Sequence, residues 1–128
     1  MRCMLIMKAT SASEAGVMPG PEIFAAMDEF NGTMIKAGVM LGGEGLHPSS
    51  AGARVKFGSG KPVVVDGPFA ETKELLAGYW ILQVKSLEEA IEWASRCPGH
   101  DASEEFEIEV RRIYDLADFP QEVIDAVP

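Results

Sequence analysis

Two short stretches of the chain hold the side chains best suited to chemistry, and each follows an apolar run. In the word DGPFAETKE, residues 66–74, Asp66 directly follows three valines. His47 follows a second apolar run and a glycine cluster. An imidazole exchanges protons readily near neutral pH, and a nearby carboxylate can orient it. We identify His47 as a candidate acid or base and Asp66 as its orienting partner or a second acid–base group, and we expect both to face one cavity.

Both residues also have a purely structural interpretation. A histidine next to Pro48 is compatible with a simple exposed loop. An aspartate before Gly67-Pro68 is typical of a turn in which its carboxylate accepts hydrogen bonds from the amides that follow. The residue types alone allow either role.

The other polar and aromatic residues of this segment are candidate ligand contacts, together with two arginines that could hold an anionic group. Four different polar side chains follow one another after Phe69, which solubility does not require, although one exposed helical turn would also explain them. Phe69 itself is expected to be a substantially buried anchor for the loop. Each arginine needs a carboxylate or a ligand as its partner. The candidate ligand-binding residues are Arg54, Phe69, Glu71, Thr72, Lys73, Glu74 and Arg111.

No metal site or cofactor is expected. Cys97 and His100 are separated by Pro-Gly, and nothing near them completes the three or four ligands that zinc requires. The glycine-rich run at 42–45 contains Glu44 and lacks the Lys-Ser/Thr of a phosphate-binding loop.

The elements that must position these residues follow the order β-α-β, a hairpin, then β-α-β again. Helix 21–37 begins at a proline and stops before Gly38, and Ser86 and Glu89 form a capping box for the second helix. Residues 11–20 are expected to form a loop, and 118–127 a short helix. Strands are expected at 1–8, 39–41, 79–84 and 106–111, the hairpin at 54–65, and the second helix at 86–97. Two β-α-β halves predict an α+β, ferredoxin-like chain with an inserted β-hairpin and both helices on one face of an antiparallel sheet.

The first strand is apolar on both of its faces, because Leu5 and Met7 alternate with Met4 and Ile6. Two helices cover only one face of a sheet. The other face therefore needs a partner, most simply a second copy of the same sheet, and we expect a homodimer. Tyr79 and Trp80 must point to opposite faces, but the sequence leaves open which of them points where.

Composition excludes several other partners. The 128 residues suffice for a single domain, 1–128, with 115–128 as a C-terminal tail. A net charge of −9 argues against direct binding to nucleic acid or to an anionic membrane. No apolar run approaches the length of a membrane span. Two cysteines without framework spacing fit a reducing compartment, so we expect a cytoplasmic protein.

The word DGPFAETKE resembles the signature of the DGPF, or YCII-related, family. Four further words agree with that family up to about Tyr114, namely GEGLHPSS (43–50), AGYW (77–80), EAIEWASRCPG (89–99) and IEVR (108–111). The resemblance implies a dimeric α+β barrel in which two ferredoxin-like sheets enclose a cleft. Relatives are suspected enzymes because a His–Asp pair lines that cleft, and they are often encoded beside sigma factors.

Two departures from the family pattern limit what can be carried over. Residues 21–37 contain no histidine, where shorter relatives place the suspected one, and Arg112 replaces the proline that usually follows the last strand. The expected function is cofactor-free acid–base chemistry on a small organic molecule. The alternatives are a non-catalytic ligand-binding or sigma-factor-associated regulatory module, and a structural dimer.

Overall fold

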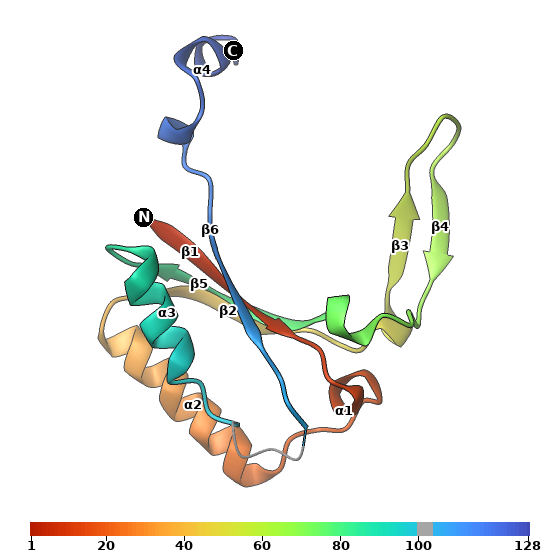
Figure 1. The fold of residues 1–128 in the computed structure, drawn as a ribbon, viewed down its shortest axis with the longest axis vertical. Coiled ribbons are helices and arrows are strands. Elements are labelled where there is room, and N and C mark those ends of the chain that lie inside the picture. Colours follow the sequence, from red (N-terminus) through yellow and green to blue (C-terminus); the bar gives the residue numbers. More distant parts are fainter. Residues whose placement is uncertain (100–103) are drawn as a thin grey trace.

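The computed structural model describes residues 1–99 and 104–128, and it shows a mixed α+β chain built on antiparallel strands (Figure 1). Four strands form one sheet in the order β2-β5-β1-β6, and two more, β3 and β4, pair separately. The strands are β1 Arg2–Lys8, β2 Met40–Gly45, β3 Ala53–Lys56, β4 Val63–Asp66, β5 Leu76–Gln83 and β6 Ile108–Arg112. The strand order and the two β-α-β halves confirm the ferredoxin-like prediction.

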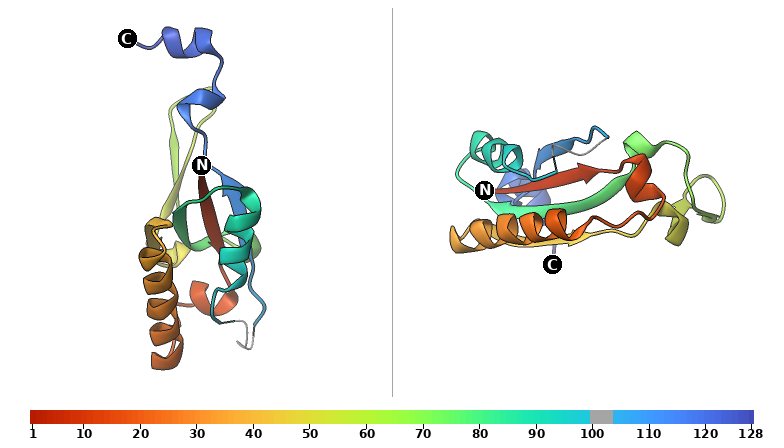
Figure 2. Two further views of the ribbon diagram at one scale, coloured as in Figure 1. Left: turned by 90° about the vertical axis from the view of Figure 1, so that its left-hand side faces the viewer. Right: turned by 90° about the horizontal axis from the view of Figure 1, so that it is seen from below.

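Two longer helices pack on this sheet, α2 (Pro21–Lys36) against β2 and α3 (Leu87–Ser95) against β1 and β6 (Figures 1 and 2). The remaining elements are the short helices α1 (Ser11–Glu14) and α4 (Gln121–Asp125) and the 3-10 turns η1 (Ser49–Ala51), η2 (Thr72–Glu74) and η3 (Leu116–Asp118). As expected, α2 begins at Pro21 and is followed by Gly38, whose φ of 74° suits only glycine. None of the helices in the described ranges is long and apolar enough to cross a membrane.

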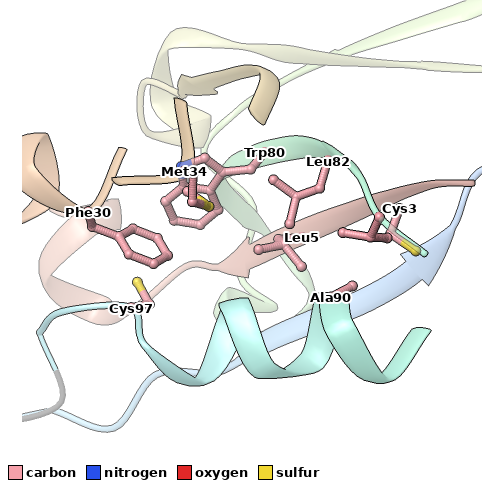
Figure 3. Packing of buried hydrophobic residues seen from close by; sticks show 9 residues of the cluster. Cys3, Leu5, Phe30, Met34, Trp80, Leu82, Ala90 and Cys97 are labelled. Carbon is pink, nitrogen blue, oxygen red and sulfur yellow. The ribbon is translucent and has the colours of Figure 1, made fainter. Parts of the chain in front are cut away.

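The core lies between the sheet and these two helices (Figure 3). Leu5, Met34 and Leu82 are completely buried there. The rings of Phe30 and Trp80 meet edge to face at a centroid distance of 5.8 Å. Trp80 also donates a hydrogen bond from Nε1 to Oδ1 of Asn31, at 2.8 Å, which ties α2 to β5.

The strand register assigns every side chain to a face. Leu5 pairs with Trp80, and both lie on the helix-covered face. Ile6 pairs with Tyr79, so Tyr79 points to the opposite face together with Met4 and Ile81. We call this second surface the helix-free face. The register thus answers a question that the sequence left open, because Trp80 belongs to the core and Tyr79 to the helix-free face.

Residues 11–20 were expected to form a loop, and this prediction is wrong for their first turn. Thr10 and Ser13 cap α1 reciprocally, each side-chain oxygen accepting a hydrogen bond from the other residue's backbone N–H, at 3.1 and 2.8 Å. Serine in place of the usual Glu or Gln concealed this capping box. The short helix expected within 118–127 is present as α4.

The last strand, β6, begins at Ile108 and not at 106 as expected. Two other strand boundaries also differ from the prediction, and glycine explains both. β2 continues through the glycine cluster, and β5 begins three residues before Tyr79. A Cβ on Gly43 would lie 2.9 Å from Cδ1 of Trp80, and one on Gly78 would lie 2.8 Å from the carbonyl oxygen of Glu44. These glycines therefore let the paired strands approach closely instead of ending them.

The capping box predicted for α3 is only half formed. The Ser86 hydroxyl accepts a hydrogen bond from the Glu89 amide at 3.1 Å. The Glu89 side chain does not return the bond, and its Oε2 is buried without a hydrogen-bond partner in the described part of the chain.

Replacing Trp80 with phenylalanine should lower the free energy of unfolding by about 1–3 kcal/mol, because Oδ1 of Asn31 loses its buried donor. Trp93→Phe is the matched control, since Trp93 is half-buried on α3 and its loss should cost less. Urea denaturation followed by circular dichroism measures both. Equal losses in the two variants would show that the Trp80–Asn31 bond contributes nothing specific.

Candidate functional site

Hydrogen bonds that involve Glu14 and Ser49 hold the 66–74 segment against the body of the protein. The Glu14 carboxylate accepts from the Ser49 amide, at 2.9 Å, and from the Ser49 hydroxyl. The Ser49 hydroxyl oxygen in turn accepts from the Phe69 amide at 3.1 Å. Glu14, at the end of α1, therefore positions the segment through Ser49.

Gly67 passes directly against the same serine. A Cβ at this position would lie 1.8 Å from the Ser49 carbonyl oxygen, which no side chain could tolerate without a backbone shift. The Gly67 amide also donates to the Gly52 carbonyl at 2.9 Å. The glycine of the 66–74 word is thus required by a close backbone approach.

Arg54 is engaged by two residues of the 66–74 segment. Its guanidinium lies 3.9 Å from the centroid of the Phe69 ring and 3.7 Å from the Glu71 carboxylate. Phe69 was expected to be a substantially buried anchor for the loop, but it is only partly buried, and its ring stacks under the Arg54 cation. This arrangement ties β3 to the segment and leaves Arg54 less available to a ligand.

His47 and Asp66 are both exposed, and no hydrogen bond or ion pair joins them within residues 1–99 and 104–128. Residues that follow each of them in the chain are nevertheless in contact. His47 lies two residues before Ser49 and Asp66 directly before Gly67, the two residues whose main chains touch. A shared cavity for this pair stays a prediction.

The helix-free face also carries a group of charged side chains where β1 pairs with β6. Glu109 accepts a hydrogen bond from Arg111 at 3.1 Å and lies 3.7 Å from the ammonium of Lys8. The hydrogen bond from Arg111, followed by the charge of Lys8, lowers the pKa of the Glu109 carboxyl. We call these three residues the ionised cluster, and they carry one net positive charge.

Lys73 is brought close to this cluster from the 66–74 segment. It lines a cavity of about 150 Å³ together with Lys8, Phe106 and two further glutamates, Glu105 and Glu107. Thr72 and Glu74 form the η2 turn beside it, with the Leu75 amide donating to the Thr72 carbonyl. The predicted site residues thus fall into two groups, one around Arg54 and Phe69 and one where Lys73 approaches the ionised cluster.

Sequence reasoning missed Glu14, Ser49 and Lys8, and it expected a carboxylate or a ligand beside Arg111 without singling out Glu109. Strand alternation could have placed Lys8 on the same face as Met4 and Ile6. Nothing in the sequence signals the Glu14–Ser49 contact, because the two residues are 35 positions apart.

Among the described residues, no group of three or more His, Cys, Asp or Glu side chains is gathered in a way that could hold a metal ion. Burial raises the pKa of the Cys97 thiol to about 11, so it stays protonated. His100 lies outside the described residues.

Gly67→Ala should push the 66–74 segment away from Ser49 and lower the free energy of unfolding by about 1–3 kcal/mol. The Phe69 amide should then exchange its hydrogen faster, as NMR can measure. Gly52→Ala serves as the control, because a Cβ there would make an ordinary contact of 3.7 Å. Unchanged exchange at Phe69 in the Gly67 variant would mean that the segment does not depend on this approach.

Arg111→Met should raise the pKa of Glu109 toward its ordinary value, because the variant loses the largest cause of the lowering. A carboxyl whose pKa is lowered by folding contributes stability above its unfolded pKa, and that contribution is lost as pH falls through the folded pKa. The stability difference between wild type and variant should therefore shrink as the solution is acidified. An NMR titration of Glu109 checks this, with Arg96→Met as the control on α3. Identical Glu109 midpoints in wild type and Arg111→Met would exclude the coupling.

Comparison with known proteins places the chain in a family. A solved 5-chloro-2-hydroxyhydroquinone dehydrochlorinase from Burkholderia phenoliruptrix AC1100, in complex with 2,5-dihydroxybenzoquinone, superposes with a TM-score of 0.48 and 15% identity over 89% of this chain and 94% of that one. An uncharacterized protein of Rhizobium meliloti (strain 1021) is 45% identical over 49 residues, which span 38% of this chain and only 40% of that relative. The family model of the YCII-related domain matches residues 1–116. The chain therefore belongs to the YCII-related domain family.

Proposed function

We propose that two copies of the chain pair through their helix-free faces, and that the cleft between them binds a small organic molecule and transfers protons on it. The single observation that carries this proposal is the composition of the helix-free face. A half-buried apolar centre, made by Met4, Ile6, Tyr79 and Ile81, lies directly beside the ionised cluster.

The apolar centre favours pairing. Four large side chains share a surface that α2 and α3 do not cover, and exposed apolar patches on a sheet are typical of association sites. A second copy offers an identical surface through a two-fold axis. Such a pairing would remove the apolar centre from water and leave the polar margin of the face as the wall of a cleft.

The ionised cluster favours an anionic ligand. Lys8 is largely covered, with 19% of its side chain exposed, while Arg111 remains accessible. Because the pKa of Glu109 is lowered, its carboxylate stays charged and keeps both cations in place. The cluster by itself carries one positive charge, and with Lys73, Glu105 and Glu107 at the adjoining cavity the charges balance. An anionic ligand such as a carboxylate or an enolate would therefore bind by direct contact with the accessible Arg111 guanidinium.

His47 lies near the same end of the sheet and is the group that we assign to proton transfer. β1 ends at Lys8, whose partner is Leu76. The Leu46 amide donates to the carbonyl of Ala77, the residue after Leu76, at 2.8 Å, and His47 follows Leu46 at this end of the sheet. Asp66 is assigned to orient the imidazole, since its neighbour Gly67 contacts Ser49.

A thermal-shift screen of small organic acids should find a ligand, because a compound at 100 times its dissociation constant adds about 2.7 kcal/mol to the free energy of unfolding. Binding should weaken in Arg111→Met and persist in Arg96→Met, which removes an arginine from α3. The bound compound should exchange a carbon-bound hydrogen with D₂O by NMR, and His47→Gln should slow this exchange without weakening binding.

Two outcomes would contradict the proposal in different ways. If the ligand loses affinity in Arg111→Met but exchanges no carbon-bound hydrogen with D₂O on the wild type, the protein binds without catalysing proton transfer. If Arg111→Met leaves the affinity of every ligand unchanged, the binding site lies elsewhere.

A further inference from the structure

Two segments project from the body of the protein and leave large apolar side chains exposed to solvent. One is the hairpin, residues 53–66, formed by β3 and β4, and the other is the stretch 113–128, which we call the C-terminal arm (Figure 1). The exposed apolar residues are Val55, Phe57, Val63 and Val64 on the hairpin, and Tyr114, Leu116, Phe119, Val123 and Val127 on the arm.

The two segments carry opposite charge. The hairpin contains three basic residues, Arg54, Lys56 and Lys61, and one acidic residue, Asp66, at its end. The arm contains four acidic residues and neither lysine nor arginine, the four being Asp115, Asp118, Glu122 and Asp125. The hairpin is thus a basic, apolar surface on an otherwise acidic chain, and the arm is its acidic, apolar counterpart.

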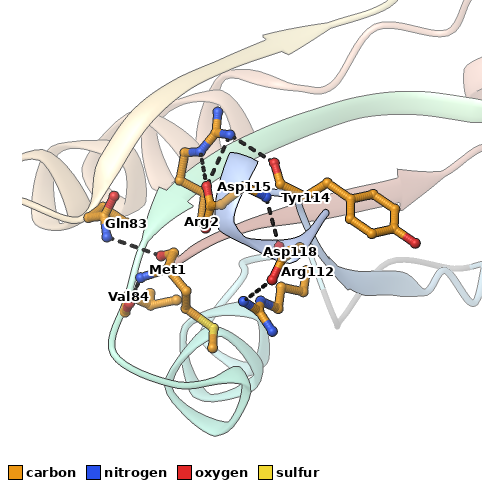
Figure 4. Close-up of polar contacts among 8 residues, drawn as sticks. All are labelled: Met1, Arg2, Gln83, Val84, Arg112, Tyr114, Asp115 and Asp118. Carbon is orange, nitrogen blue, oxygen red and sulfur yellow. Dashed lines mark hydrogen bonds and ion pairs between the residues drawn. The ribbon is translucent and has the colours of Figure 1, made fainter. Parts of the chain in front are cut away.

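The first half of the arm is already neutralised by its own chain (Figure 4). Arg2 bonds to Asp115 at 3.3 Å, and Arg112 bonds to Asp118 at 2.9 Å. Beyond this point, no ion pair holds Glu122 or Asp125 within the described residues. Within the described residues, the distal half of the arm therefore exposes apolar side chains next to two carboxylates that form no ion pair.

On the hairpin, Glu71 already pairs with Arg54. Lys56 and Lys61 are both exposed and form no ion pair in the described ranges. Two lysines on the hairpin thus match two carboxylates on the distal arm.

The hairpin and the arm leave the sheet from opposite ends. The hairpin follows β2 and precedes β5 at the end where Lys8 pairs with Leu76, whereas the arm follows Arg112, which pairs with Cys3 at the other end of β1. Figure 1 shows them separated, although both point the same way along the long axis in Figures 1 and 2. A helix as short as α4, Gln121–Asp125, is not stable by itself and requires packing.

We infer that the arm of one subunit packs on the hairpin of a second copy, and that the partner's arm packs reciprocally on the first hairpin. Two-fold pairing satisfies both contacts at once, because each chain supplies one basic and one acidic apolar segment. The inference rests on the homodimer of the proposed function and adds to it a contact outside the helix-free face.

Charge-reversal variants test whether the arm of each subunit packs on the hairpin of the other. The hairpin variant is Lys56→Glu with Lys61→Glu, and the arm variant is Glu122→Lys with Asp125→Lys. Each variant alone faces like charges at both contacts, so its dimer dissociation constant, measured by sedimentation at low salt, should rise about tenfold. An equimolar mixture of the two variants restores opposite charges at both contacts. It should form a heterodimer with nearly wild-type affinity, visible by native mass spectrometry.

Matched controls separate this effect from a general charge effect. Lys36→Glu with Lys85→Glu gives the same net charge as the hairpin variant but alters exposed lysines elsewhere on the body, and it should dimerise as the wild type does. Circular dichroism confirms that each variant folds. Differences between the variants should diminish at high salt.

The outcomes distinguish this inference from the proposed function. If Ile6→Lys dissociates the dimer while neither charge variant does, the helix-free faces pair and the arm exchange is wrong. If both charge variants weaken the dimer but their mixture does not recover, the arm does not contact the partner's hairpin. A wild type that is monomeric at micromolar concentration would overturn both proposals.

Discussion

The pairing of β1 with β5 determines the two faces of the main sheet, and both the core and the proposed cleft depend on it. Because side chains alternate along a strand, Leu5 and Trp80 are directed to the helices and Ile6 and Tyr79 away from them. A shift of one residue would exchange the two sets. The completely buried core then belongs to one face, and the half-buried apolar centre and the ionised cluster share the other.

The 66–74 segment depends on contacts that are distant along the chain. Glu14 reaches it through Ser49, Gly67 passes against the same serine, and Arg54 stacks on Phe69. Each contact uses a different property of the segment, respectively an amide, the missing Cβ and an aromatic ring. The missing Cβ and the ring account for Gly67 and Phe69 among the residue types of the segment.

The distribution of charge connects the proposed cleft with the proposed exchange of arms. The acidic residues dominate the chain, yet the hairpin and the ionised cluster each retain positive charge. In an acidic protein, accessible cationic side chains are where an anionic ligand or an acidic segment can bind. The two proposals assign the cluster to a small molecule and the hairpin to the arm of a second copy.

The sequence by itself determined the ferredoxin-like order, the limits of α2 and the apolar character of both faces of β1, because periodicity, proline, glycine and caps act over a few residues. It did not determine α1, whose cap uses serine, or the continuation of β2 through glycines that Trp80 requires. Of the candidate site, it singled out the 66–74 segment and the arginines but not Glu14, Ser49 or Lys8. Only the tertiary structure decided which face Tyr79 and Trp80 occupy and which carboxylate meets which arginine, since these depend on strand register and on contacts between residues far apart in the chain.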